Sequence, residues 1–223
     1  MDPGLNNLLK WSLNQSNQPN AVTATDPTTE STTSVTTPQS QPSGARGLDQ
    51  EALARLLGGP SDADLMREAM AAIESPEVDL ENKLIAFDNF EQLIENLDNA
   101  NNMENLKLWM PLVGQLKSTE SELQRMAAWC VGTAVQNNIK SQERCLAIGA
   151  VPQLVSMALS DGPKAMRKKS VYALSSAVRN YQPALNALVA ELPAEFRGED
   201  KLDASDMEAV DQLIDRLREH VNQ

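Results

Sequence analysis

The feature of this sequence that most constrains its fold is a helical pattern that recurs about every 40 residues. Segments 125–138 (RMAAWCVGTAVQNN) and 168–181 (KKSVYALSSAVRNY) align without gaps at a spacing of 43 residues, and segment 84–97 (LIAFDNFEQLIENL) precedes the first by 41. Pro111 and Pro152, each at the start of a shorter predicted helix, are also 41 residues apart. All-helical units of about 40–47 residues are typical of armadillo and HEAT repeats, which bury their apolar faces only by stacking. The sequence therefore predicts an all-α fold, a short armadillo-type α-solenoid of about three repeats with capping helices.

The first repeat opens with a strongly amphipathic helical pattern. Asp79 is placed to cap its start, because an aspartate side chain accepts hydrogen bonds from the first free backbone amides of a helix. The pattern stops at residues 98–102 (DNANN), whose short polar side chains bond local backbone groups and favour helix ends. Its apolar residues are spaced three or four apart and form one stripe: Leu80, Leu84, Phe87, Phe90, Ile94 and Leu97.

Composition divides the rest of the chain into flanking segments. The linker has too few apolar residues to offset the entropy of an ordered chain, so we expect it to be disordered. Ser61, Thr119 and Ser205 each precede an acidic residue by three positions, a capping-box arrangement that predicts a helix start at each. The predicted organisation is a short apolar segment at 1–13, a disordered Ser/Thr/Pro/Gln-rich linker at 14–47, capping helices within 48–74, armadillo-like repeats at 75–192 and a C-terminal capping helix within 193–223.

Charge and targeting signals narrow the possible partners and location. The chain carries a formal net charge of −12 and a pI near 4.5, which argues against nucleic acid and anionic membranes because both attract Lys/Arg-rich patches. It contains no apolar run of transmembrane length and no signal-peptide pattern. We therefore expect a cytoplasmic protein whose two cysteines, Cys130 and Cys145, are reduced and buried.

No arrangement of residues in the sequence suggests catalysis. The single histidine, His220, lies near the C-terminus without a nucleophile and acid to pair with it. Gly58-Gly59-Pro60 is typical of a helix stop rather than a phosphate-binding loop, and the cysteines lack a metal-binding spacing. The sequence thus predicts no enzymatic activity, no metal and no cofactor. Since both ends of the solenoid carry capping helices, we expect a monomer.

Amides gather where each long predicted helix ends, and they are the candidate binding residues. Such side chains recognise a partner by hydrogen bonding without carrying charge. The alternative is that each asparagine only caps its helix or bonds the adjacent backbone. Ala100 lies among the amides of the first cluster, where a small side chain would let a partner approach closely. On the concave face lined by the third, long helix of each repeat, the candidate residues are Asn96, Asn99, Ala100, Asn101, Asn102, Gln136, Asn137, Asn138, Arg179 and Asn180.

The sequence also resembles a known protein family. Residues 76–81 (PEVDLE), 86–89 (AFDN) and 93–101 (LIENLDNAN) resemble the first armadillo repeat of the nucleotide-exchange factors for heat-shock protein 70 chaperones, and the fungal branch is the most similar. Residues 132–138 (GTAVQNN) are similar to the second repeat, and 5–13 (LNNLLKWSL) to the N-terminus of those proteins. The sequence departs from the longer members after Tyr181, where only a partial further unit follows.

The resemblance implies a co-chaperone that binds the ATPase domain of cytosolic heat-shock protein 70 and accelerates ADP release. Client release, protein folding and translation-linked quality control are the processes such a role implies. The alternative is an armadillo adaptor that binds extended peptides without affecting nucleotide exchange. The N-terminal residues Leu8, Leu9 and Trp11 form an apolar island around Lys10. One interpretation is that this segment docks on the body of the protein or has no role. The other is that it mimics a substrate in the chaperone's peptide groove.

Overall fold

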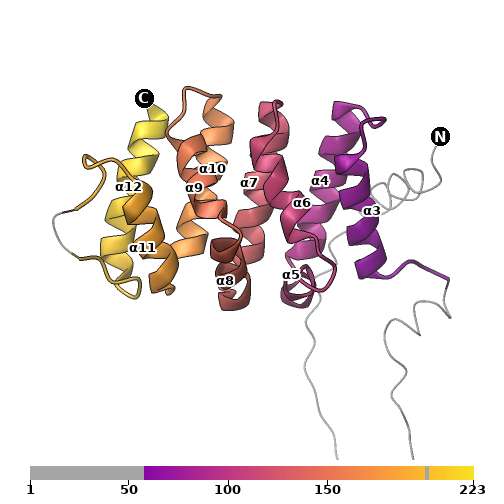
Figure 1. Cartoon of the computed structure of the whole chain (residues 1–223), viewed down its shortest axis with the longest axis horizontal. Coiled ribbons are helices and arrows are strands. Elements are labelled where there is room, and N and C mark those ends of the chain that lie inside the picture. The colour runs from indigo at the N-terminus through magenta and orange to yellow at the C-terminus, as the bar shows by residue number, and fades with distance from the viewer. Residues whose placement is uncertain (1–57, 199–200) are drawn as a thin grey trace, which may run out of the picture.

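The computed structural model describes residues 58–198 and 201–223. Within these residues, ten α-helices and one short 3₁₀ helix stack side by side into an elongated body without β-strands (Figure 1). This arrangement agrees with the predicted all-α solenoid. The predicted segments 1–13 and 14–47, and the first predicted capping helix at 48–57, lie outside the described residues.

The stack repeats a unit of one long helix followed by two shorter ones. Helix α3 (Asp62–Glu74) directly precedes the first unit, and α12 (Met207–Asn222) packs on α10 where the next long helix would stand. The units are α4 (Leu80–Ile94), α5 (Leu97–Asn102) and α6 (Trp109–Gly114) with the 3₁₀ helix η1 (Gln115–Lys117); α7 (Ser121–Val135), α8 (Ile139–Ala147) and α9 (Ala150–Ala158); and α10 (Lys164–Val178) with α11 (Gln182–Glu191).

The long helices form one layer and most of the shorter helices form the other. Helices α3, α4, α7, α10 and α12 contact one another in that order. In Figure 1, α6, α9 and α11 lie over this layer, while α5 and α8 stand together at its lower edge. One continuous core runs between the layers, with Trp109, Phe87 and Phe90 among its largest fully buried side chains. The amphipathic stripe of α12 covers the last unit as predicted, through Val210 and Leu217 among others.

Local sequence signals explain most helix boundaries. Ser61 accepts a hydrogen bond from the Asp64 amide, and Asp79 accepts one from the Asn82 amide, so both predicted caps are confirmed. Gly149 separates α8 from α9 in the left-handed conformation, at φ 73°, which glycine adopts without steric cost.

Three predictions about boundaries were wrong. Helix α7 follows Glu120 and α12 is capped by Asp206, so neither Thr119 nor Ser205 caps a helix as predicted. The run after Ile94 is not a simple helix end, because Asn96 caps a new helix, α5, that contains the predicted stop residues 98–102. Leu97 therefore leaves the buried stripe and is 56% exposed.

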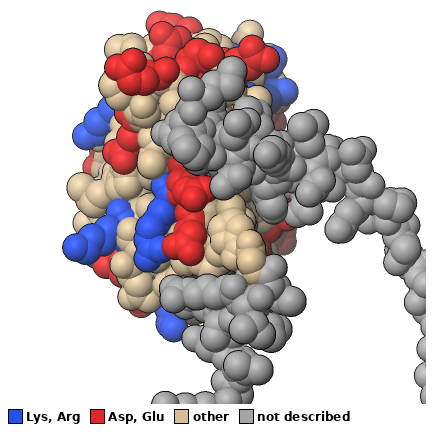
Figure 2. All heavy atoms as spheres, turned by 90° about the vertical axis from the view of Figure 1, so that its right-hand side faces the viewer, with Lys and Arg blue, Asp and Glu red and all other residues tan. Residues whose placement is uncertain are grey.

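Acidic side chains gather in the upper part of the α3 end of the stack, and basic side chains lie on the same end (Figure 2). Figure 2 looks onto this end and shows Asp and Glu gathered there, and the α3–α4 connection carries the exposed residues Glu74, Glu77, Asp79 and Glu81. Across residues 58–198 and 201–223, no helix combines the length and the apolar character needed to cross a membrane. The same residues contain no cluster of His, Cys, Asp and Glu suited to a metal ion.

Candidate functional site

The outer surface of the long-helix layer contains a hollow, which we call the long-helix hollow. Side chains one helical turn apart on α7 face it, and neighbours on α4 and α10 close its two sides. The hollow encloses about 430 Å³ and is lined by Glu91, Glu95, Trp129, Thr133, Gln136, Asn137 and Tyr172. A carboxylate wall from α4 therefore faces an aromatic and polar wall from α7 and α10.

Glu91 is the most buried charged residue of the hollow, with only 4% of its surface exposed. The hydroxyl of Thr133 donates a hydrogen bond of 2.6 Å to Glu91 Oε1, which fixes the carboxylate between α4 and α7. Burial raises the pKa of Glu91, and the negative charges of Glu95 and Asp88 raise it further. The Thr133 hydrogen bond and the positive charge of Lys169 act in the opposite direction.

Two aromatic rings in the hollow are held in place by polar neighbours. The ammonium of Lys169 lies 3.7 Å from the ring centroid of Trp129 and 5.5 Å from that of Tyr172. Such cation–π contacts contribute about 0.5–2 kcal/mol, depending on how far the cation is desolvated. Burial lowers the pKa of Lys169. The hydroxyl of Tyr172 donates a 3.4 Å hydrogen bond to Gln136 Oε1, which joins α10 to the end of α7.

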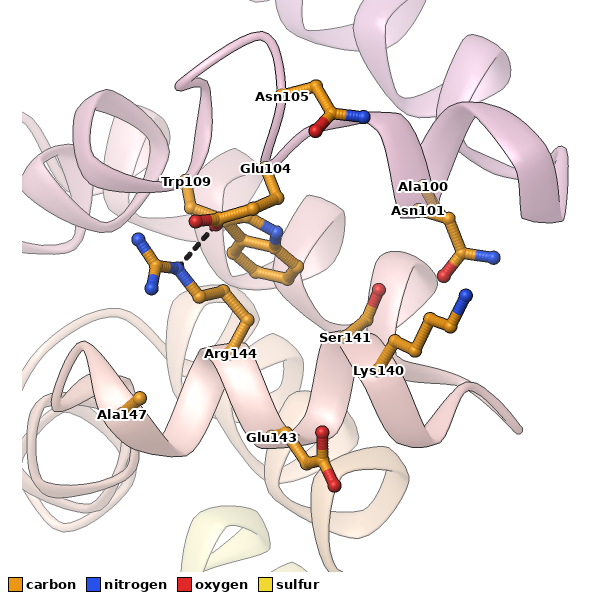
Figure 3. Close-up of a pocket in the computed structure, with 10 residues that line it drawn as sticks. All are labelled: Ala100, Asn101, Glu104, Asn105, Trp109, Lys140, Ser141, Glu143, Arg144 and Ala147. Atoms are coloured by element: carbon orange, nitrogen blue, oxygen red, sulfur yellow. Dashed lines mark ion pairs between the residues drawn. The ribbon is translucent and has the colours of Figure 1, made fainter.

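A second hollow lies between the short helices α5 and α8, and we call it the α5–α8 groove (Figure 3). It encloses about 480 Å³, and an ion pair between Glu104 and Arg144, 2.5 Å long, crosses it. Trp109 and Ala100 belong to its buried floor. Its lining residues are Ala100, Asn101, Glu104, Asn105, Trp109, Lys140, Ser141, Glu143, Arg144 and Ala147.

The groove holds polar atoms that make no hydrogen bond within the described part of the chain. Ser141 is only 2% exposed, yet neither its Oγ nor the Oδ1 of Asn101 has such a partner. Figure 3 shows both groups directed into the same space, beside the ammonium of Lys140. A buried hydroxyl without a partner costs about 1–3 kcal/mol, so these groups are suited to bond an incoming polar ligand.

Four of the predicted amides have roles in the local backbone. The side chains of Asn96 and Asn138 cap α5 and α8 by accepting hydrogen bonds from amides of the first turn. Asn137 and Asn180 have φ of 51° and 57°, in the left-handed region that asparagine tolerates better than most residues. The turns after α7 and α10 therefore favour asparagine, which supports the local backbone role that the sequence left open for these residues.

The other predicted residues divide between the two hollows and internal contacts, and Asn137 also lines one of the hollows. Gln136 and Asn137 line the long-helix hollow, and Ala100 and Asn101 line the α5–α8 groove. Ala100 is 3% exposed and belongs to the floor of that groove. The remaining three make internal contacts: Asn99 donates to Asp62 and to the Leu93 carbonyl, Asn102 accepts from Asn105, and Arg179 forms an ion pair with Asp211 of α12.

Sequence reasoning missed the carboxylate and aromatic residues of the long-helix hollow. Glu91, Thr133 and Lys169 had no place in the predicted binding set. Trp129 and Tyr172 occupy equivalent positions 43 residues apart, a correspondence that served only to define the repeat. Two aromatic residues recurring away from the buried stripe were the available signal, because a large ring outside the core often belongs to a contact surface.

Comparisons with known proteins agree with this architecture. A family model described as nucleotide exchange factor Fes1 matches residues 5–103, and one for the C-terminal domain of SIL1, FES1 and HPBP1 matches residues 99–192. A crystal structure of an engineered protein shares the fold at a TM-score of 0.50 and 19% identity, covering 79% of this chain and 76% of that one.

Relatives from fungi match this chain over nearly its whole length. The Hsp70 nucleotide exchange factor FES1 of Gibberella zeae is 54% identical over 224 residues, which cover 99% of this chain and 98% of that protein. The proteins of the same name from Neurospora crassa and Coccidioides immitis are each 49% identical; the matches cover 98% of this chain and 98% and 99% of theirs. Because identity near one half extends over nearly the whole length, this chain belongs to the FES1 family of Hsp70 nucleotide exchange factors.

Proposed function

We propose that this chain performs the activity of its family by binding the ATPase domain of an Hsp70 chaperone and accelerating the release of ADP. ATP then replaces ADP and the chaperone releases its client, which promotes protein folding. Membership of the FES1 family supports the choice of partner. The chain contributes no chemistry of its own to the nucleotide in this proposal, and it acts in the cytoplasm as a monomer.

The mechanism is a coupling between two binding events on the chaperone. A protein that binds the open form of the ATPase domain more tightly than the closed, ADP-bound form lowers ADP affinity by the same factor. A difference of about 1.4 kcal/mol weakens ADP binding tenfold, and couplings of about 1–3 kcal/mol are usual. A stack with one continuous core, as described here, is suited to this role because it resists bending to follow the closed form.

The long-helix hollow is the proposed contact with the ATPase domain. The single observation that carries this choice is its combination of Trp129 and Tyr172, left half-exposed on adjacent long helices, with polar groups around them. Half-buried aromatic side chains with polar neighbours are the usual anchors of protein interfaces. Of the predicted amides, Gln136 and Asn137 belong to this surface. Ala100 and Asn101, in the α5–α8 groove, would extend the contact around the lower edge.

Release of a fluorescent ADP analogue from purified Hsp70, followed by stopped flow, tests this proposal. We expect the wild-type chain to accelerate release and Gln136→Arg to lose most of that effect, because the arginine places bulk and charge in the hollow. Gln212→Arg is the matched control, the same change at an exposed position of α12. Acceleration by both variants would move the contact elsewhere and keep the function. No acceleration by the wild type would refute the function and favour a peptide-binding adaptor.

A further inference from the structure

We infer that the long-helix hollow is a receptor for one basic side chain of the partner, and that an arginine guanidinium fits it best. The inference rests on the proposed function, since it names what the bound ATPase domain must present to this surface. Its basis is the composition of the hollow: two carboxylates on one wall and two aromatic rings on the other.

The carboxylates of the hollow have no ion-pair partner in the described part of the chain, although the charge of Lys169 partly offsets that of Glu91. Among the described residues, neither Glu91 nor Glu95 forms an ion pair with any lysine or arginine. Glu95 is exposed at the end of α4, one helical turn from Glu91. Asp88 adds a third negative charge to the same face of α4, near enough to raise the pKa of Glu91. An incoming cation would therefore meet negative charge that Lys169 offsets only in part.

The aromatic wall already binds a cation of the chain. The ammonium of Lys169 lies 3.7 Å from the centroid of Trp129, which shows that the face of this ring accepts a positive charge. Lys169 forms no ion pair with Glu91, although its positive charge still acts to lower the pKa of that carboxyl. The ring of Tyr172, whose hydroxyl is turned to Gln136, borders the empty part of the hollow.

An arginine uses every part of this arrangement. Its planar guanidinium can bond a carboxylate with two parallel N–H groups while its face stacks on an aromatic ring. The hydrogen bond from Thr133 holds Glu91 in one orientation before binding, which lowers the entropic cost of forming such a pair. Burial of Glu91 strengthens its attraction for a cation, because charges interact more strongly where water is excluded.

An acidic side chain of the partner is a poorer occupant. Two cations near the hollow are both engaged, Lys169 with the Trp129 ring and Arg125 with Glu122 at 2.8 Å. An incoming carboxylate would also face the charges of Glu91 and Glu95. The two occupants therefore predict opposite effects of charge changes in the hollow, and this difference in sign makes the inference testable.

The test measures the affinity of the full chain for full-length Hsp70 by calorimetry. Glu95→Lys should weaken binding about tenfold or more, which corresponds to about 1.4 kcal/mol. A lysine at the end of α4 also suits the helix dipole, so folding is not impaired. Lys169→Gln should strengthen binding severalfold by removing a competing charge. Glu191→Lys is the matched control, because Glu191 is also an exposed acid at a helix end, α11, outside the hollow.

A reciprocal charge swap identifies the partner residue. Exposed arginines and lysines of the ATPase domain are reversed to glutamate one at a time, and one reversal should weaken binding of the wild type and restore binding of Glu95→Lys. Unchanged affinity of Glu95→Lys, or weaker binding of Lys169→Gln, would overturn the inference. If the wild type accelerates ADP release while Glu95→Lys binds normally, only this inference fails. If the wild type accelerates nothing, the proposed function fails first.

Discussion

Replacing Gly132 with alanine should destabilise the protein, because α10 packs directly against this glycine of α7. A β-carbon at position 132 would lie 2.5 Å from Cε1 and 2.6 Å from Cδ1 of Tyr172, and 3.1 Å from Cα of Ala173. The ring could turn away, but the Ala173 contact is with backbone and requires the helices to separate. The small buried side chains around Ala173 on α10 leave no space into which either helix could move.

The expected magnitude follows from two opposing terms. Overpacking a well-packed core costs about 1–3 kcal/mol, and a clash with backbone belongs in the upper part of that range. Exchanging glycine for alanine within a helix returns about 0.5–1 kcal/mol. The net loss should therefore be about 1–2 kcal/mol, which for a domain of this size lowers the melting temperature by roughly 2–8 °C. Because Tyr172 is also displaced, binding to Hsp70 should weaken in the folded variant.

Urea denaturation of the wild type, Gly132→Ala and Gly114→Ala measures this effect. Gly114 is the matched control, because a β-carbon there would meet no atom within 4 Å and its φ of −56° is helical. Gly114→Ala should be neutral or slightly stabilising. If Gly132→Ala has the same free energy of unfolding as Gly114→Ala, α7 and α10 do not pack as closely as the contacts at Gly132 require.

Four further results are expected. Burial raises the pKa of Glu91 above its ordinary value of 4.5, so the folded state binds more protons than the unfolded state and the free energy of unfolding falls as pH rises from 4.5 through the raised pKa. Glu91→Gln should remove this contribution to the pH dependence, measured by denaturation at several pH values, and should gain stability at neutral pH. An unchanged pH dependence would contradict the expectation. Burial raises the pKa of Cys145 to about 12, so a thiol reagent should label it only after unfolding, and rapid labelling of the native protein would refute this. Asn138→Ala should cost about 0.5–2 kcal/mol as a lost helix cap, whereas Ser141→Ala should stabilise the protein in chemical denaturation, by up to about 1–3 kcal/mol, because its buried hydroxyl has no partner among the described residues. Deleting residues 1–14 should slow client release and leave ADP release unchanged if this segment mimics a substrate, and equal client release would refute that role.

The fold could be predicted because its signals are local and repeated. The spacing of apolar residues determines the buried face of each helix, and recurrence at 41 and 43 residues requires that units stack. At Leu97 the apolar spacing predicts burial incorrectly. Leu97 continues the apolar spacing of α4, yet the backbone turns at Glu95 and Asn96 and places it on the surface. A turn of two residues is too short a signal to override a regular pattern of apolar residues.

The binding surfaces were less predictable because they depend on how neighbouring units are placed. The asparagines drew attention through their number, but Asn137 and Asn180 adopt a left-handed backbone conformation that itself favours asparagine. The residues that form the long-helix hollow come from three units. Glu91 and Thr133, which share a hydrogen bond, are 42 positions apart in the sequence. No local pattern indicates that they meet, since only the stacking of α4 on α7 brings them together.

The most direct test of the account is whether nucleotide and exchange factor oppose each other on Hsp70 by the same factor. The affinity of ADP for the chaperone is measured with and without saturating amounts of this chain, and the affinity of the chain is measured with and without saturating ADP. Both affinities should fall, and the ratio of the affinity without the other ligand to the affinity with it should be the same for ADP and for the chain, about 5–150. An ADP affinity that is unchanged in the presence of bound chain would contradict it.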